Sequence, residues 1–273
     1  MAKATPLSRP RGRPPSGKTT QTSSVQALDR ALGLLELLAD EEGLTLSELA
    51  QRADMAPSTT HRLLSTLQGR HFVDLDEETS QWQIGVKTFQ IGSTFARHRK
   101  LVTMGRGIMR ALMETCEETV NLAIEDEGDV VFISQFESHS PMRAFFRPGH
   151  RGAIHASGIG KALMATWEEG AVRKLVRKKQ LVGFTDKTHR DAGSLLADLE
   201  RIRDRGWSVD DEEHTLGMRC IAAPIFNEYG EAIAGVSVSG PTIRIPDDRV
   251  DRIGPEVQHA ADRITDSIGG IRP

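Results

Sequence analysis

Two short amphipathic helices separated by a tight turn are the feature that most restricts how this chain can fold. Thr45-Leu46-Ser47-Glu48 has capping-box spacing and predicts a helix that ends near Arg52. A second helix is predicted to start around Ala56-Pro57-Ser58, because proline is tolerated in a first helical turn. Its inward face is predicted to carry the apolar residues Leu63, Leu64 and Leu67.

The opposite face of this second helix is polar and carries one cation. Hydroxyl and guanidinium groups there can reach base edges and phosphates. A helix-turn-helix of this kind places its second helix in the major groove, so we expect double-stranded operator DNA as a partner. The candidate DNA-binding residues are Ser58, Thr59, Arg62, Ser65 and Thr66.

Elements on both sides complete a winged helix-turn-helix. Alternating residues in 72–75 and 81–84 predict two strands around a turn at Asp76-Glu77-Glu78-Thr79, which form the wing. An amphipathic helix of about 15 residues is predicted before the two short ones, ending near Asp40. Its apolar stripe is predicted to comprise Val25, Leu28, Leu32, Leu35 and Leu38.

The charge of this region does not by itself favour DNA. Residues 23–85 hold eleven acidic and four basic side chains, a net charge of −7, which is unfavourable for generic phosphate binding. The stretch 56–73 has no acidic residue and contains Arg62, Arg70 and two histidines, so its local charge suits DNA. A helical protein-interaction module is the alternative interpretation.

The first 22 residues form a basic tail with five cations and no acid. They are rich in Pro, Ser, Thr and Gly, and we expect them to be disordered in the free protein. Pro10-Arg11-Gly12-Arg13-Pro14 resembles an AT-hook core, in which Arg11 and Arg13 would lie in a narrow minor groove. A solubilising tail is the alternative.

The remaining chain divides into a connecting region and a second domain. Helical patterns over about 86–98 and from Leu101 to about Glu118 predict linker and dimerisation helices, with intramolecular core as the alternative. We therefore expect a homodimer, or a tetramer built as a dimer of dimers, since paired half-sites multiply specificity. The predicted domains are 1–22, 23–85, 86–118 and 119–273.

Residues 119–273 predict an antiparallel α+β domain, because strands are followed by helices and then by strands again. Helices are expected over 157–166 and 194–205. The expected strands are 121–124, 130–133, 142–147, 220–225 and 232–239.

Two features of this domain suggest an anion site. In the last strand Ser237 and Ser239 share one face, while Ala232, Ala234, Val236 and Val238 share the other. Buried hydroxyls need partners, which a ligand carboxylate, the backbone or water can supply. Ser157-Gly158-Ile159-Gly160 opens a helix whose first N–H groups can bind an anion.

Several protein classes are excluded. No apolar run is long enough to cross a bilayer, and the amino terminus lacks the apolar segment of a secretory signal. Cys116 and Cys220 are the only cysteines, which rules out a disulfide scaffold or a four-cysteine zinc site and fits the cytoplasm. A P-loop is excluded around Gly160-Lys161, because position 155 is His and position 162 is Ala. We expect no cofactor and no metal.

The motifs together resemble those of IclR-type transcriptional regulators over roughly residues 25–268. In the first domain the resemblance lies in Gln26-Ala27-Leu28-Asp29-Arg30-Ala31-Leu32, Leu46-Ser47-Glu48-Leu49-Ala50 and Pro57-Ser58-Thr59-Thr60-His61-Arg62-Leu63-Leu64. In the second it lies in His155–Ala162, Asp210–His214 and Cys220–Ser239. It implies a linker helix and a GAF-like effector-binding sheet.

The chain looks most similar to the glyoxylate-sensing branch of that family, which is related to allantoin-utilisation repressors. This likeness implies a regulator whose operator binding responds to a small 2-oxo acid, with glyoxylate the first candidate and an aromatic or hydroxy acid the alternative. Ile159 departs from the alanine of that branch. The implied effector-binding residues are Gly158, Ile159, Asp210, Cys220, Ser237 and Ser239.

An enzyme is the remaining alternative. His214 and Cys220 offer a base and a nucleophile, but no flanking motif supports such chemistry. We therefore expect a regulator without catalytic activity.

Overall fold

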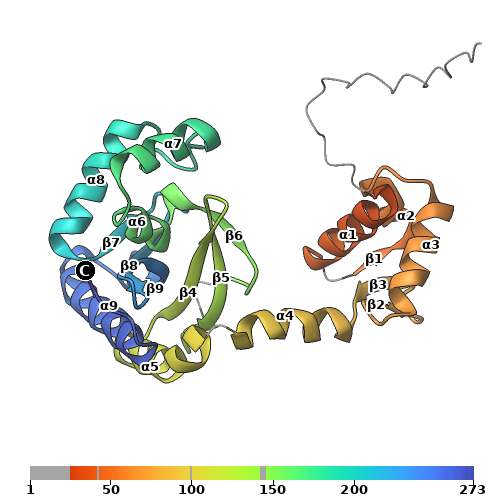
Figure 1. The fold of residues 1–273 in the computed structure, drawn as a ribbon, viewed down its shortest axis with the longest axis horizontal. Helices are drawn as coiled ribbons and strands as arrows, with labels where there is room; N and C mark the ends of the chain where they lie inside the picture. The colour runs from red at the N-terminus through yellow and green to blue at the C-terminus, as the bar shows by residue number, and fades with distance from the viewer. Residues whose placement is uncertain (1–24, 42, 99, 142–145) are drawn as a thin grey trace, which may run out of the picture. The chain divides into compact units, whose positions relative to one another are not determined.

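The computed structural model describes residues 25–41, 43–98, 100–141 and 146–273 (Figure 1). The chain divides into two compact units, residues 1–93 and 94–273. The basic tail with Arg11 and Arg13 lies outside the described residues. So does most of the strand predicted over 142–147, and the described Phe146 and Arg147 are not in a strand.

The first unit is a winged helix-turn-helix, as predicted. The capping box forms: Thr45 Oγ1 accepts from the Glu48 backbone N–H, and Glu48 Oε2 accepts from the Thr45 N–H at 2.8 Å. The wing strands β2 and β3 pair antiparallel, and the short strand β1, which the sequence analysis missed, joins β3 at the other edge. The elements are α1 (Gln26–Ala39), β1 (Leu44–Thr45), α2 (Leu46–Arg52), α3 (Pro57–Gln68), β2 (Val73–Asp76) and β3 (Gln81–Ile84).

The buried face of α1 agrees with the predicted stripe at Leu35 and Leu38 and differs from it toward the start of the helix. Leu34 and Leu38 are the buried residues of this helix and enter the core with Leu49, Leu64 and Trp82. In contrast, more than half of the surface of Val25 and Leu28 is exposed, and Leu32 is 50% exposed. Helical periodicity shows which residues share a stripe, but which stripe is covered depends on where α2, α3 and the wing lie.

Two helices follow the wing, close to the predicted positions. Helix α4 spans Val86–His98, as expected. Helix α5 spans Lys100–Cys116 and ends just before Glu117, whose φ of 55° is incompatible with a continuing helix.

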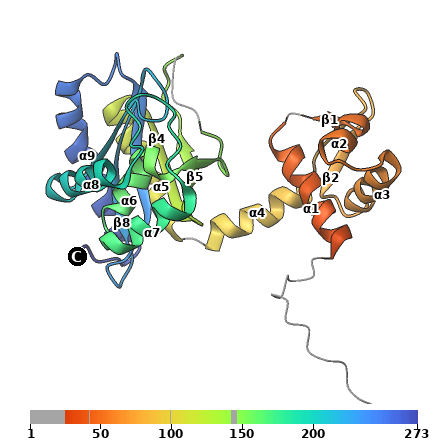
Figure 2. The ribbon, with the colours of Figure 1, turned by 90° about the horizontal axis from the view of Figure 1, so that it is seen from above.

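The second unit is built on a six-stranded antiparallel sheet with the order β6-β5-β4-β9-β8-β7, which confirms the predicted α+β architecture. Helices α5 and α9 pack on one face, and α6, α7 and α8 on the other. Both views show α6 lying against β8 (Figures 1 and 2). The strands are β4 (Thr119–Asp126), β5 (Asp129–Phe136), β6 (Arg151–Ala153), β7 (Ser208–Asp211), β8 (Met218–Phe226) and β9 (Ala232–Pro241).

Strand β9 separates its two faces largely as predicted. Ala234, Val236 and Val238 pack with α5 and α9, while Ser237 and Ser239 lie on the opposite face. Ala232 is the exception: it packs on the α6 side, because a register shift in the β8–β9 pairing falls between Ile225 and Phe226.

The remaining helices include two that the sequence analysis did not predict, α7 and α9. Helix α9 contains Pro255, and an internal proline hides a helix from pattern reasoning because it normally ends one. Strand β7 was also missed because it is only four residues long. The bounds are α6 (Gly158–Met164), α7 (Glu169–Lys179), α8 (Ala192–Arg205) and α9 (Asp247–Ser267), with a 3₁₀ turn at Ile154–Ala156.

Candidate functional site

The outward face of α3 presents the predicted polar residues. Ser58, Arg62, Ser65 and Thr66 are exposed and Thr59 is half-buried, whereas Thr60 and Leu64 face the core. Pro57 occupies the first turn, where its missing N–H has no consequence for the helix.

Some of these side chains already make hydrogen bonds within α3, which limits what they can offer to a partner. Thr66 Oγ1 donates to the Arg62 carbonyl at 2.8 Å, so in this conformation the hydroxyl can offer only its oxygen to a partner. Ser65 Oγ lies 3.5 Å from His61 Nδ1. Within the described part of the chain, the Arg62 guanidinium makes no ion pair, so it remains available to a phosphate or base.

A small cavity of about 60 Å³ lies in the second unit, between the start of α6 and the β7–β8–β9 part of the sheet. All six predicted effector residues line it, namely Gly158, Ile159, Asp210, Cys220, Ser237 and Ser239. A larger, open depression of about 660 Å³ lies elsewhere, near Arg203 and Arg272, and contains none of them.

Strand register explains how residues distant in sequence meet in the cavity. Asp210 on β7 is paired with Cys220 on β8, and Cys220 is paired with Ser239 on β9. Because directly opposite residues point to the same face of a sheet, these three side chains form one row. Gly158 closes over the row, and a Cβ added there would lie 2.8 Å from Cys220 Sγ. Only glycine fits at this position.

A chain of hydrogen bonds crosses the sheet toward the thiol. Gln135 Nε2 donates to Asn121 Oδ1 at 2.9 Å, and Asn121 Nδ2 donates to Ser239 Oγ at 3.2 Å. Ser239 Oγ in turn donates to Cys220 Sγ at 3.2 Å. The sequence analysis treated Ser237 and Ser239 as equivalent donors to a ligand, but the proton of Ser239 is directed at the sulfur.

Ser237 is the unsatisfied member of the site. Its side chain is completely buried, and its Oγ makes no hydrogen bond of regular geometry among the described residues. It lies close enough to the Cys220 thiol to lower the pKa of that group, but this contact is too poor to satisfy the hydroxyl. A buried hydroxyl without a partner costs about 1–3 kcal/mol relative to a paired one. Such a group lining a cavity needs a hydrogen-bond partner from outside the chain, which a ligand atom or a water molecule can supply.

The acid and the thiol in the row both favour their neutral forms. Desolvation raises the pKa of Asp210 to about 7, and the nearby Glu213 carboxylate adds to the rise. The backbone N–H of Glu213 donates to Asp210 Oδ1 at 2.8 Å. Burial, followed by the charge of Asp210, raises the pKa of the Cys220 thiol to about 11. Near neutral pH the cavity therefore offers proton donors to an anion.

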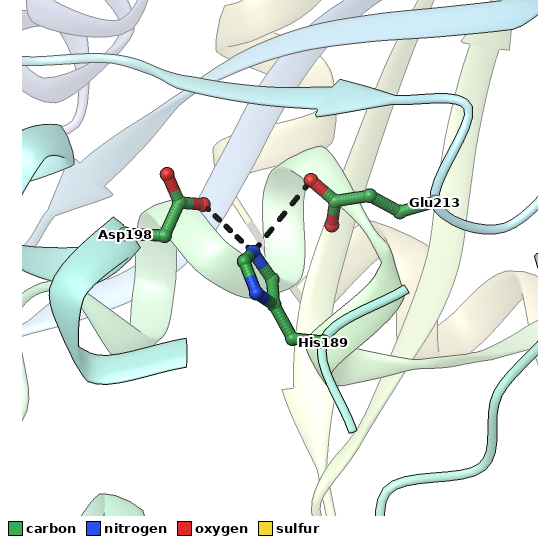
Figure 3. Close-up of side chains that lie close together, drawn as sticks. All are labelled: His189, Asp198 and Glu213. Carbon is green, nitrogen blue, oxygen red and sulfur yellow. Dashed lines mark ion pairs between the residues drawn. The ribbon is translucent and has the colours of Figure 1, made fainter. Parts of the chain in front are cut away.

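Behind Asp210 lies a buried charge network centred on Lys161. Its Nζ donates to Asp198 Oδ2 at 2.6 Å, to the carbonyl of Val209 at 2.7 Å, and to Glu213 Oε1. His189 approaches the same two carboxylates (Figure 3), with its Nε2 3.4 Å from Asp198 Oδ2 and 3.9 Å from Glu213 Oε1.

His189, Asp198 and Glu213 have the residue types of a metal site, and their ligand atoms lie within 4.8 Å of one another. However, the Lys161 ammonium already contacts both carboxylates and supplies the cation that they need. This arrangement fits an ion-pair network better than a metal centre. Through the Val209 carbonyl and Glu213, the network holds the strand and turn that carry Asp210.

Helix α6 contributes less to anion binding than its sequence indicates. It spans only seven residues, so its dipole is short, and Ser157 Oγ already accepts from the Gly160 N–H at 3.4 Å. Gly158 and Ile159 thus act mainly by shaping the cavity.

An aromatic group lines one part of the cavity, and the sequence analysis missed it. Phe132 and Phe146 stack with ring centroids 4.5 Å apart, and His150 lies beside them. His214 also lines the cavity and packs on Phe184 at 4.5 Å. These residues come from β5, the segment before β6 and the turn after β7, which no local sequence pattern connects.

Comparison with known proteins identifies both units. Residues 27–77 match the IclR helix-turn-helix domain, and residues 94–266 match the bacterial transcriptional regulator IclR C-terminal domain. The chain belongs to the IclR family. Members of this family are DNA-binding transcriptional regulators with a C-terminal effector domain.

Relatives cover nearly the whole chain. The HTH-type transcriptional regulator BhcR of Paracoccus denitrificans is 49% identical over 93% of this chain and 91% of its own length. The transcriptional repressor IclR of Escherichia coli is 44% identical, with 98% and 99% of the two chains covered. The Escherichia coli repressor AllR is 36% identical, with 96% and 97% covered.

The fold is also found in solved IclR-family structures. The crystal structure of Thermotoga maritima IclR matches with a TM-score of 0.77 at 24% identity, covering 89% of this chain and 99% of that one. The described helices of the present chain include none long and apolar enough to span a membrane.

The enzyme alternative finds no support in the geometry. Within the described residues His214 makes no hydrogen bond to Cys220, and its Nδ1 lies 3.0 Å from Thr215 Oγ1 instead. The raised pKa of Cys220 is also opposite to that of an activated thiolate nucleophile. The IclR family consists of transcriptional regulators, which also favours a regulator over an enzyme.

Proposed function

We propose that this IclR-family regulator binds a small 2-oxo acid, with glyoxylate the first candidate, in the cavity of the second unit, and that the ligand changes its affinity for operator DNA. The single observation that carries the proposal is Ser237. Its buried, partnerless hydroxyl lies in a cavity with the thiol of Cys220 and with Asp210, whose pKa is raised to about 7. A carboxylate bound there accepts the hydrogen bonds that the protein leaves unmade.

The size of the cavity favours glyoxylate over an aromatic acid. A water molecule needs roughly 10–15 Å³ of the same kind of volume. A cavity of about 60 Å³ therefore holds about five atoms of that size. Glyoxylate has five heavy atoms, whereas an aromatic acid would require the Phe132–Phe146 wall to move. Ile159, buried against Gly235, keeps the space small.

On the DNA side, we assign α3 to the major groove and the β2–β3 wing to the adjacent backbone. Arg62 supplies the charged contact, and Ser58, Thr59, Ser65 and Thr66 supply polar contacts around it. Arg11 and Arg13 of the basic tail would add minor-groove contacts, which would offset the acidic charge of the domain.

Exposed apolar side chains in the first unit support self-association. Val25, Leu28 and Leu32 on α1 are 50–68% exposed, and Val86 and Ile91 on α4 are 59% and 52% exposed. Val25, Leu28 and Leu32 recur at helical spacing and so share one face, and an exposed apolar face of this kind marks an interaction surface. A dimer, or a tetramer of paired dimers, would cover them and would present two α3 helices to a pseudo-palindromic operator.

A titration of operator against effector tests the proposal. A fragment from upstream of the protein's own gene is bound by the full chain and challenged with glyoxylate, pyruvate, glycolate and 4-hydroxybenzoate. We expect glyoxylate to change operator affinity by about 5- to 150-fold, the usual range of allosteric coupling. A response to 4-hydroxybenzoate alone would replace glyoxylate by an aromatic effector. Failure to bind any promoter fragment at modest ionic strength would contradict the proposal.

A further inference from the structure

The two cysteines of the chain have opposite surroundings. Cys116 is 3% exposed and packs in the apolar core between α5, α9 and the sheet. Cys220 retains partial exposure and lines the cavity. A small molecule in the cavity therefore meets the sulfur of Cys220, whereas Cys116 is out of its reach.

The sulfur is held in a defined orientation. Ser239 Oγ donates to Cys220 Sγ, and Ser239 is itself fixed by Asn121. Asp210 is directly opposite Cys220 in the β7–β8 pairing. The Cβ atoms of such a pair lie about 4.5–5.5 Å apart, so the Asp210 carboxyl is within reach of a molecule bound at the sulfur.

A second observation independently indicates a ligand at this position. Ser237 Oγ lines the same cavity, is fully buried and has no partner among the described residues. It can donate to a carboxylate whose neighbouring carbon then lies over Cys220. The cavity thus combines a carboxylate contact, a thiol and a proton-carrying acid.

We propose that Cys220 captures an aldehyde-bearing 2-oxo acid covalently and reversibly, as a hemithioacetal. The inference rests on the proposed function and narrows its ligand class from 2-oxo acids in general to those whose oxo group is an aldehyde. Acids with a ketone, such as pyruvate, add thiols less readily because their carbonyl carbon is more hindered and less electrophilic.

The addition is balanced without any further reactant. The neutral Asp210 carboxyl donates its proton to the aldehyde oxygen as the Cys220 sulfur forms a bond to the aldehyde carbon. The π pair of the C=O bond becomes the O–H bond of the new hydroxyl, a sulfur lone pair forms the C–S bond, and the thiol proton passes to Asp210 and leaves its bonding pair on sulfur. Nothing is oxidised or reduced, and the reverse sequence releases the aldehyde.

The weak acidity of the thiol is compatible with this role. Thiolate is the faster nucleophile, so the raised pKa of Cys220 slows attack. The adduct nevertheless forms from a neutral thiol and a neutral carbonyl, so its equilibrium stability does not require a thiolate. A sensor needs only a reversible equilibrium, whereas an enzyme would need rapid turnover.

The decisive measurement is ¹³C NMR of the full-length protein with [2-¹³C]glyoxylate. Wild type should show a protein-bound resonance for a carbon bonded to both sulfur and oxygen, distinct from the free hydrate, and excess oxamate should abolish it. Oxamate is a planar 2-oxo acid anion of similar size without an aldehyde. Because this reading is made on wild type, it does not depend on the folding of any variant.

Two variants locate the adduct. Cys220→Ala should lose the resonance, and by calorimetry its glyoxylate affinity should fall roughly tenfold or more beyond any fall in its oxamate affinity, because both anions lose the contact with the thiol and only glyoxylate loses the covalent bond. The matched control Cys116→Ala should keep the resonance. Glyoxylate binding without the wild-type resonance, or with equal affinity in Cys220→Ala, would overturn covalent capture and leave the proposed function intact. Absence of binding by both glyoxylate and oxamate would overturn the proposed function itself.

Discussion

The outward face of α3 and the cavity of the second unit both offer polar groups to a ligand, but they hold them in opposite ways. On α3, Ser58, Arg62 and Ser65 are exposed, so water satisfies whatever the protein does not. In the cavity Ser237 is fully buried and has no partner in the described structure, which is unfavourable until a ligand binds. An unpaired polar group on the surface is therefore weak evidence for a ligand, whereas an unpaired polar group in the interior is strong evidence for one.

The largest expected effect is on operator binding, and it tests the exposed face of α3. Arg62→Ala removes the exposed guanidinium of α3 and should weaken operator binding by about 1–3 kcal/mol per half-site, doubled in a dimer. Fold, oligomer size and effector affinity should not change, because Arg62 contacts solvent. Electrophoretic mobility shift and calorimetry measure the two affinities.

Arg52→Ala is the matched control for Arg62. It removes the same charge from the same unit, but Arg52 lies at the end of α2 and forms an ion pair with Glu41 at 2.6 Å. Its operator affinity should stay close to wild type. Equal losses for the two variants would mean that Arg62 acts through net charge rather than through contacts of α3.

The next largest expected effect is on the free energy of unfolding, and it tests the buried charge network behind the cavity. Lys161→Met removes the cation from between Asp198 and Glu213, both of which are nearly inaccessible to water. Among the described residues, Asp198 keeps Arg201 at 3.0 Å, but Glu213 keeps only His189 at 3.9 Å. The loss of the buried cation should lower the free energy of unfolding by about 3–5 kcal/mol, measured by chemical denaturation. Lys187→Met is the control, since the Lys187 side chain is 47% exposed in its ion pairs with Asp211 and Glu212, and the loss of these pairs should be hardly measurable. Similar losses in both variants would show that burial does not set the value of these ion pairs.

Lys161 also marks the limit of what the sequence could predict. It follows Gly160 directly, and the sequence analysis considered it only as part of an excluded phosphate loop. Its partners Asp198 and Glu213 are 37 and 52 residues away, on α8 and after β7. Ion pairs between residues so far apart in sequence depend on how the helices pack on the sheet. They cannot be predicted from local patterns in a single sequence.

Local patterns succeeded where the physics is local. The Thr45 capping box and the two-residue period of β9 each depend on neighbours within a few positions. The capping box formed as expected, and the period of β9 holds from Ala234 to Ser239. The six effector residues were assigned by resemblance to the family, not by periodicity. What remained invisible was the Asn121–Ser239–Cys220 relay, since it depends on the register of β4, β9 and β8.

Ser237→Ala tests whether the partnerless hydroxyl belongs to the effector. A hydrogen bond to a charged group contributes about 1.5–3 kcal/mol, so glyoxylate affinity should fall roughly 10- to 150-fold. The stability of the ligand-free protein should be unchanged or slightly higher, because an unsatisfied buried group is removed. The double variant with Ser239→Ala should lose glyoxylate binding while operator binding survives.

Ser267→Ala provides the control for Ser237. Its hydroxyl donates to the Ile264 carbonyl at the end of α9 and does not line the cavity. Effector affinity should therefore be unaltered. If Ser237→Ala also leaves effector affinity unaltered, Ser237 is not part of the binding site.

The smallest effect is a pH dependence that arises only in the cavity. Asp210, with its pKa raised to about 7, is mostly neutral below that pH and can donate to an anion. Above it the carboxylate repels the ligand, so glyoxylate affinity should fall as pH rises through 7, by up to about tenfold per unit. Burial lowers the pKa of His214, so its titration lies at lower pH. Burial raises the pKa of Glu213, but this residue does not line the cavity and cannot contact the ligand there.

Asp210→Asn separates this slope from every other titration. The carboxamide keeps a donor of similar shape but cannot ionise, so calorimetry from pH 6 to 8.5 should give a nearly flat profile with affinity close to that of wild type at low pH. Operator binding by α3 should keep the same pH profile in both proteins, because Asp210 does not belong to that surface. A wild-type slope that persists in Asp210→Asn would assign the titration to another group and remove the neutral acid from the proposed binding chemistry.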